Sequence, residues 1–369
     1  MNEYVTNTIT GSVSKQSAGS QSLKRWFLMA LLLATWLPIA FFILLAPPGS
    51  EGGGLGGIKT VFLFLGGAAH VPATLLFYTD TEFAGIRTRH PWRYFYVPLF
   101  LIVVTGLIFA FTPLVVHPFV LLLFWAWQAY HYGRQNTGIF SFASVAETGK
   151  GARKLEKLAI EAGTVVAILG TFKILGAQVA PAYLRGAFDY LYQFGFFAFI
   201  GVAIFSVVVY AKYFAEASLF KTIFFFTAVF FFLPLFLSIN ENVAFLSYAI
   251  AHGLQYIVFM SVVSATTPEG EGRSFPYKSV ATLLVCVLII GFGFWRVNDL
   301  REMDFVKGVW AYARGADFLF GAVLGATMSH FVIDANAWRL SLEKQRAYVA
   351  KRFYFVFQPQ RGIEKTNQA

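Results

Sequence analysis

Residues 26–46 read WFLMALLLATWLPIAFFILLA, a run that contains no ionisable side chain. An α-helix rises about 1.5 Å per residue, so this run is long enough to cross a hydrocarbon core of roughly 30 Å. The run is also longer than the apolar segment of a signal peptide, and no cleavage site of small residues is placed convincingly after it. We therefore predict that this first helix stays in the protein as a membrane anchor.

The composition extends this prediction to the rest of the chain. Hydrophobic residues make up 57% of the 369 residues, charged residues only 13%, and the mean hydropathy is +0.62, values that a soluble core of this size does not need. The phenylalanine-rich run at 224–236 is expected to face lipid, the alternative being a wall around an apolar substrate. We predict an all-α polytopic integral membrane protein with about ten transmembrane helices, over residues 26–46, 58–78, 94–112, 113–132, 158–177, 190–211, 222–238, 243–264, 279–295 and 318–338.

The polar ends of the chain are expected to lie outside the membrane. Residues 1–22 are rich in Ser, Thr and Gln and have no apolar core, which predicts a disordered cytosolic tail. Residues 23–338 form the predicted transmembrane helical domain. Residues 339–369 are predicted to be a basic cytosolic tail.

The basic residues predict the orientation of the helices, because Lys and Arg are more frequent in cytoplasmic loops. With both termini in the cytoplasm, 22 of the 29 Lys and Arg lie in cytoplasmic segments, six lie on the opposite side, and Lys173 lies within a span. We therefore predict a multi-pass protein of the inner (cytoplasmic) membrane with both termini cytoplasmic. The net charge of +10 then needs no nucleic-acid partner, since the excess lies beside an anionic leaflet.

Four histidines lie within predicted spans: His70, His131, His252 and His330. Ionisable side chains are costly in hydrocarbon, so a histidine there is a functional hypothesis by default. All four predicted helices run from outside to inside, which allows their residues to be compared by depth. At about 1.5 Å per residue, His70, His252 and His330 fall within about 5 Å of one another, and His131 lies nearer the cytosolic edge. The pattern predicts one buried metal centre with these four histidines as ligands.

Polar side chains at helical spacing accompany the histidines, since residues three or four apart share one face of a helix. Asp334 lies one turn after His330, as a candidate ligand or orienting acid, and Tyr256 lies one turn after His252. We take Asp334 and Tyr256 as the candidate catalytic side chains. The simpler explanation for any single histidine is a hydrogen bond to Ser, Thr or Tyr of a neighbouring helix.

The available donors limit the choice of metal. The single cysteine, Cys286, lies within a span, so neither a disulfide nor a thiolate site can be built. Imidazole with carboxylate or water suits non-haem iron, zinc, copper or manganese. Fe(II) with open positions for dioxygen is the expected cofactor, with zinc or haem as alternatives. His90 and His117, each followed by a proline, are expected to be surface residues.

Three short islands of the chain carry a resemblance to a known family: GGAAH at 66–70 with Asp80, YHYGRQN at 130–136 and AHGLQY at 251–256. They resemble the histidine-bearing helices of the Brp/Blh-type β-carotene dioxygenases, which are polytopic membrane enzymes. The resemblance implies histidine-bound non-haem iron and cleavage of a carotenoid by dioxygen. The family pattern pairs two histidines four residues apart in a late helix, whereas the residue four after His252 is Tyr256. His330 and Asp334 are candidates for the missing ligands.

The sequence therefore favours a membrane-embedded, metal-dependent oxidoreductase. We expect a non-haem iron oxygenase or desaturase that acts on a lipid or isoprenoid, with the bilayer and an apolar small molecule as its partners. A proton-coupled secondary transporter is an alternative in which the histidines and Asp334 relay protons or bind substrate. A bis-histidine haem membrane protein is a third possibility.

Overall fold

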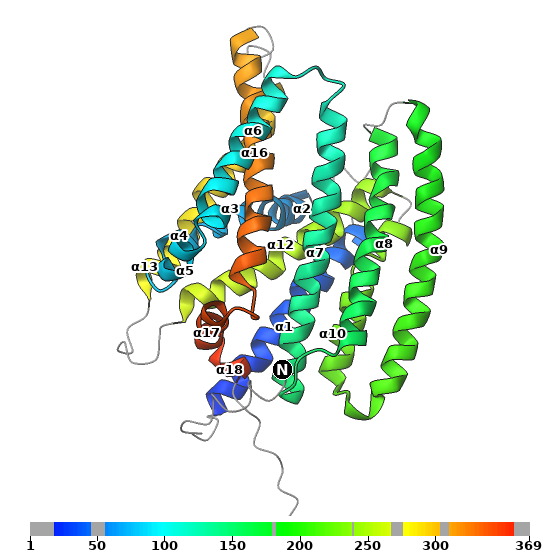
Figure 1. Cartoon of the computed structure of the whole chain (residues 1–369), viewed down its shortest axis with the longest axis vertical. Coiled ribbons are helices and arrows are strands. Elements are labelled where there is room, and N and C mark those ends of the chain that lie inside the picture. The colour runs from blue at the N-terminus through cyan, green and yellow to red at the C-terminus, as the bar shows by residue number, and fades with distance from the viewer. Residues whose placement is uncertain are drawn as a thin grey trace, which may run out of the picture.

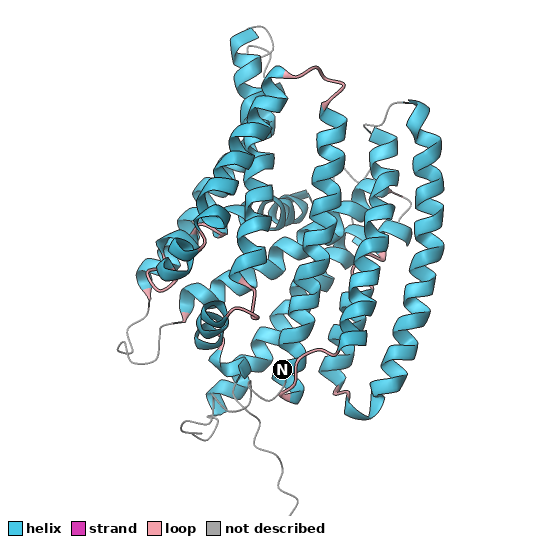
Figure 2. Ribbon diagram, in the orientation of Figure 1, coloured by secondary structure: helices cyan, strands magenta, loops and turns pink. Residues whose placement is uncertain are grey.

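The computed structural model describes residues 18–45, 56–178, 182–237, 240–266, 276–302 and 310–357. Within these ranges the chain is helical and forms no strand (Figure 2), which confirms the all-α prediction. Residues 1–17 and 358–369, which belong to the two predicted tails, lie outside the described residues.

The helices follow one another with short connections. In chain order they are α1 (Ala18–Ala40), η1 (Phe41–Leu45), α2 (Gly56–Phe62), η2 (Leu63–Ala69), α3 (His70–Ala73), α4 (Leu76–Thr79), α5 (Ala84–Arg89), η3 (Trp92–Tyr96), α6 (Val97–Phe111), α7 (His117–Thr148), α8 (Lys154–Gln178), α9 (Ala182–Tyr213), η4 (Phe214–Glu216), α10 (Leu219–Val229), α11 (Pro234–Leu237), α12 (Glu241–Ala265), α13 (Tyr277–Val285), η5 (Cys286–Ile290), α14 (Gly291–Glu302), α16 (Trp310–Ala337), α17 (Glu343–Arg352) and α18 (Tyr354–Phe357).

Seven segments of the described chain are long and apolar enough to cross a membrane: Ser20–Leu44, Ile58–Thr79, Trp92–Phe111, Ala182–Tyr213, Val243–Ala265, Tyr277–Val297 and Ala313–Ala337. This confirms the prediction of a membrane protein, while the predicted number of about ten spans is confirmed only for these seven. The other three expected spans correspond to α7, α8 and the pair α10–α11. α7 has polar residues along its middle, α8 carries charged side chains, and α10 has only 11 residues.

α7 lies between two groups of helices (Figure 1). On one side it packs against α8 and α10, and α9 packs against α8 at the outer edge. On the other side it contacts α16, which pairs along its length with α6. α1 packs along α12, and these two helices run obliquely to the upright ones in Figure 1.

Glycines allow some of these helices to pack backbone against backbone. A Cβ atom at Gly321 would lie 2.4 Å from the carbonyl oxygen of Thr105, and one at Gly325 would lie 2.4 Å from that of Leu101. This spacing of small residues four apart is the usual means of close approach between membrane helices, where lipid gives no hydrophobic drive for association. It explains why α16 and α6 remain in contact along their length.

The phenylalanine-rich run does not face lipid, which corrects the first of the two expectations for it. Phe225, Phe231 and Phe232 are all at most 3% exposed, and the ring of Phe232 lies 5.3 Å from that of Tyr248 in α12. The chain turns between α10 and α11, so the rings on both sides of the turn point into the bundle. This segment is therefore part of the aromatic core.

The C-terminal helices α17 and α18 pack onto the bundle, so the part of the expected tail that is described has a defined structure. Phe353 and Phe355 are buried, and both rings lie within 5.6 Å of Phe27 in α1. Arg352 forms an ion pair of 2.9 Å with Asp80, which follows α4, and one of 3.0 Å with Glu82. The C-terminal helices therefore contact both α1, at the other end of the described chain, and the turn that follows α4.

Candidate metal centre

The four predicted ligands lie in four different elements and converge. His70 begins α3, while His131, His252 and His330 lie within α7, α12 and α16. All four side chains are buried, with exposed fractions of 3%, 7%, 0% and 1%. The structure thus brings together every histidine that the sequence analysis assigned to the site.

Irregular backbone precedes and follows His70. The seven residues before it form the π-helix η2, an element that is frequently found at functional sites. Pro72 has no N–H to donate to the preceding turn, and the next two turns tighten, with Thr74 N bonded to Val71 O at 3.1 Å and Leu75 N to Pro72 O at 2.9 Å. The change from a wide to a tight helix sets the direction of the side chains between His70 and Thr74.

Two glycines place His70 next to His252. A Cβ atom at Gly253 would lie 1.9 Å from the carbonyl oxygen of Gly66, and one at Gly66 would lie 2.6 Å from that of Ile250. The backbones of η2 and α12 are therefore in direct contact. Because Gly66 precedes His70 by one turn and Gly253 follows His252 directly, this contact brings the two imidazoles together.

The four imidazole rings form a closed cycle. The centroid of His70 lies 5.2 Å from that of His252 and 5.3 Å from that of His330. The centroid of His131 lies 5.0 Å and 5.2 Å from the same two rings. His252 and His330 are 6.2 Å apart across the cycle.

Two overlapping triads of donor atoms lie within this cycle. One atom from each of His70, His252 and His330 lies within 4.8 Å of the others, and the same holds for His131, His330 and Asp334. Two ligands about 2.1 Å from an ion and at a tetrahedral angle are about 3.4 Å apart. The donors of each triad could therefore share an ion after moving together by at most about 1.4 Å, and His330 belongs to both triads.

Several of the imidazole nitrogens lack a hydrogen-bond partner. Among the described residues, neither ring nitrogen of His252 makes a hydrogen bond, and the same is true of Nε2 of His131 and of His330. The ring of His70 lies next to the backbone of Gly66 and Gly67, one turn earlier. A buried polar group without a partner costs about 1–3 kcal/mol. Each imidazole can offer one nitrogen to an ion, and buried nitrogens without hydrogen-bond partners on converging histidines suit metal ligands better than structural hydrogen bonds.

Aromatic side chains hold two of the rings in place. His131 stacks on Phe331 with centroids 4.3 Å apart, and His252 stacks on Tyr132 at 3.9 Å. The carbonyl oxygen of His252 accepts a hydrogen bond of 3.1 Å from Gln135 in α7. These contacts fix the rings from the side opposite to the cycle.

Both candidate catalytic residues lie next to His330. The Tyr256 hydroxyl donates a hydrogen bond of 3.0 Å to Asp334 Oδ1, and its ring lies 4.7 Å from that of His330. Asp334 Oδ2 lies 3.6 Å from His330 Nε2. Two ligands at about 2.1 Å from an ion and at a tetrahedral angle are about 3.4 Å apart, so Asp334 and His330 can share an ion with little movement.

Thr74 completes this group, although the sequence did not identify it as part of the site. Its Oγ1 lies 2.9 Å from the Tyr256 hydroxyl and 2.6 Å from His330 Nδ1. The only signal in the sequence is a threonine one turn after a histidine, which is common in helices.

Other polar residues near the histidines in sequence lie elsewhere in the structure. Asp80 forms its ion pair with Arg352, and Arg134 forms one with Glu161 in which both side chains are exposed. His117 is buried rather than at the surface, because its ring packs 4.5 Å from Phe109 at the start of α7. Helical spacing alone does not distinguish these residues from members of the site.

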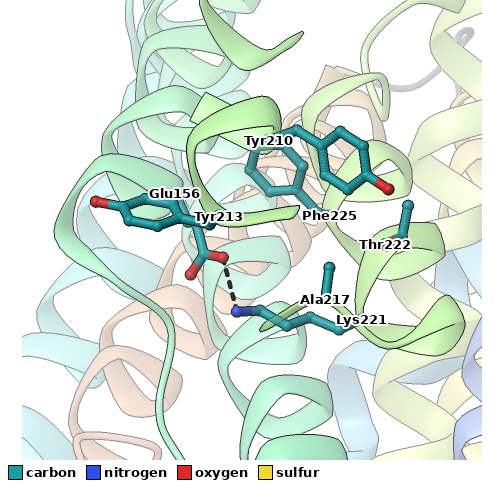
Figure 3. A pocket seen from close by; sticks show the side chains of 7 residues that line it. All are labelled: Glu156, Tyr210, Tyr213, Ala217, Lys221, Thr222 and Phe225. Atoms are coloured by element: carbon teal, nitrogen blue, oxygen red, sulfur yellow. Dashed lines mark ion pairs between the residues drawn. The ribbon is translucent and has the colours of Figure 1, made fainter. Parts of the chain in front are cut away.

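A second buried polar cluster lies away from the histidines, between α8, α9 and α10 (Figure 3). Glu156 and Lys221 form an ion pair of 2.8 Å with both side chains 7% exposed. A pocket beside this pair is lined also by Tyr210, Tyr213 and Phe225, and no histidine lines it. The ion pair links α8 to α10 and is separate from the candidate metal centre.

Comparisons with protein-family models, with curated proteins and with solved structures find no match to this chain.

Proposed function

We propose that this protein is a membrane-embedded metal-dependent oxidoreductase, a non-haem iron oxygenase or desaturase that acts on a lipid or isoprenoid. The observation that supports a metal is the convergence of four buried histidines from four helical elements, which form two overlapping triads of possible donor atoms with Asp334 and leave nitrogens of His131, His252 and His330 without hydrogen-bond partners among the described residues. Histidine and carboxylate without sulfur is a donor set that suits Fe(II), and zinc is the second choice. A dry aromatic surrounding suits a substrate that arrives from lipid.

In this proposal each residue has a distinct role. His70, His131, His252 and His330 hold the ion, and Asp334 is a fifth donor or an orienting acid beside His330. Iron in such a site supplies activation of dioxygen for attack on a substrate that has no hydrolysable bond. Tyr256 holds a proton next to Asp334 through its hydrogen bond of 3.0 Å. Phe331 and Tyr132 exclude water from the outer faces of His131 and His252.

Two other functions fit the same residues less well. A haem needs a flat cavity between two imidazoles, but the four rings lie 5.0–5.3 Å from their neighbours around the cycle. A proton-coupled transporter is favoured by one observation, the continuous set of hydrogen bonds through His330, Thr74, Tyr256 and Asp334. Metal content distinguishes the transporter from the oxidoreductase.

We further propose that ten segments cross the inner membrane and that both termini are cytoplasmic. The distribution of Lys and Arg supports this orientation. The packing of α18 against α1 also supports a shared side for the two ends of the described chain (Figure 1). A reporter fused after Ala369 should be active only in its cytosolic form, and a periplasmic signal there would overturn the orientation.

The metal content of the detergent-purified protein tests the proposed function. Stoichiometric iron without a Soret band is the expected result, a Soret band would indicate haem, and no metal would favour transport. Replacing His70, His252 or His330 with Ala should lower metal content by roughly 10-fold or more. This is at least the loss of metal affinity that follows from removing a group that only orients a ligand. His90→Ala, which changes a half-buried histidine of the loop after α5, should leave the metal in place. Full metal loading in all three variants would contradict the shared site.

A further inference from the structure

Four polar side chains at the candidate metal centre form a closed ring of contacts, and His330 is one of them. Thr74 Oγ1 lies 2.6 Å from His330 Nδ1 and 2.9 Å from the Tyr256 hydroxyl. Tyr256 donates to Asp334 Oδ1 at 3.0 Å, and Asp334 Oδ2 lies 3.6 Å from His330 Nε2. All four residues are at most 4% exposed, so water cannot replace a missing partner without entering the bundle.

Counting protons fixes the direction of every hydrogen bond in this ring. The Tyr256 hydroxyl donates its single proton to Asp334 Oδ1. The Tyr256 oxygen must then accept from Thr74, which uses the single proton of that hydroxyl. Thr74 can therefore only accept from His330, and Nδ1 of His330 carries the proton.

The geometry points to Thr74 as a positioning residue that makes Nε2 the metal-binding nitrogen of His330. This inference rests on the proposed metal centre and adds the device that fixes one of its ligands. In the other tautomer, Nε2 would carry the proton and face Asp334 as a hydrogen-bond donor. Nε2 would then have no lone pair available to bind the ion. An acceptor on Nδ1–H also fixes the ring and raises the basicity of the ligand nitrogen.

The orientation of the Thr74 side chain is unusual for a helical threonine. Threonine hydroxyls in helices commonly bond back to the carbonyl four residues earlier, and Thr137 and Thr327 do so here, each at 3.0 Å. The hydroxyl of Thr74 instead reaches two side chains from α12 and α16. The turn after Pro72, where the helix tightens, makes this orientation available.

The test uses one substitution that removes the hydroxyl and one that keeps it. Thr74→Val keeps the shape and removes the hydroxyl, while Thr74→Ser keeps the hydroxyl. Thr137→Val is the matched control, because Thr137 is also buried but its hydroxyl bonds only to the backbone oxygen of Gly133. Two properties are measured on the full-length protein: the ¹⁵N spectrum of histidine-labelled, metal-free protein, which reports the tautomer of each ring, and the affinity for added Fe(II) or Co(II).

We expect the His330 signal of the wild type, identified by its loss in His330→Gln, to show the proton on Nδ1. Thr74→Val should shift it toward the Nε2–H tautomer and lower metal affinity by about 10- to 100-fold, the range for groups that orient ligands. Thr74→Ser and Thr137→Val should match the wild type in both properties. A Thr74→Val protein with the wild-type tautomer and affinity, or a Thr74→Ser protein as impaired as Thr74→Val, would overturn the inference. A wild type that binds no metal would overturn the metal centre, and the tautomer signal would still decide whether Thr74 sets the proton on His330.

Discussion

A single methyl group at Gly253 should dismantle the proposed metal centre without touching a ligand. The Cβ atom of Gly253→Ala would lie 1.9 Å from the carbonyl oxygen of Gly66, and real Cβ contacts are essentially never shorter than 3.0 Å. The obstacle is backbone, so α12 and η2 must separate by more than about 1 Å. Metal–ligand distances are held to within about 0.2 Å, so His70 and His252 can no longer bind the same ion. Overpacking of this kind costs about 1–3 kcal/mol, which a membrane bundle of this size can survive.

The matched control lies in the same element. Gly67, the neighbour of Gly66, has no atom within 4 Å of the position of an added Cβ, and alanine favours a helix by up to about 1 kcal/mol over glycine. We expect Gly67→Ala to keep its metal and its thermal stability, and Gly253→Ala to lose at least about 10-fold in metal content. The assay is elemental analysis of monodisperse protein after size-exclusion chromatography. Wild-type metal content in Gly253→Ala would refute the claim that this helix contact positions His70 and His252.

Two further predictions concern Asp334 and the C-terminal helices. Asp334→Asn should insert and fold but lose most metal, because the amide keeps the size and loses the negative charge, while Asp334→Glu should retain part of the metal; an Asn variant with wild-type metal content would leave a histidine-only centre. Burial, and then the charge of Asp80, raises the pKa of Tyr348 well above its usual value, and the Tyr348 hydroxyl donates to Asp80 at 2.7 Å. Because the pKa of Tyr348 is higher in the folded state, its contribution to stability is fully present below the unfolded-state pKa of about 10. This contribution is lost as the pH rises through the folded-state pKa. Melting curves of Tyr348→Phe should therefore lie below those of the wild type at neutral pH and converge with them at strongly alkaline pH; equal melting temperatures at neutral pH would count against this role.

The class of the fold could be predicted because it depends on composition and length alone. A run such as residues 26–46 has one stable arrangement in a bilayer, a helix that satisfies its own backbone. The span count was harder, because α7 carries Gln128, His131 and Gln135 in its middle and so lacks the apolar composition of a simple span. Whether such a helix is shielded depends on neighbours that are distant in sequence.

The site was predicted in part for the same reason. Histidines in hydrocarbon are costly, which marks all four as candidates, and the similar depth of His70, His252 and His330 follows from helix direction. His131 was expected nearer the cytosolic edge, but its ring lies 5.0 Å from that of His252 and 5.2 Å from that of His330. Thr74 could not be identified, because its role depends on the break at Pro72 and on side chains from two other helices. Asp80 follows the helix of His70 closely in sequence, but its charge is neutralised by Arg352, which lies 272 residues later in the chain. Tertiary contacts of this range have no signal in a single sequence.

The packing around His70 and His252 supports the proposed metal centre over the transporter alternative. A transporter must move one group of helices against another around its binding site. Here η2 and α12 touch through Gly66 and Gly253, and a Cβ at Gly291 of α14 would lie 2.8 Å from Ala69, the residue before His70. A movement that separated His70 from His252 would have to break these backbone contacts within a turn of the two histidines. A metal centre gains from the same rigidity, because preorganised donors lose little entropy when the ion binds.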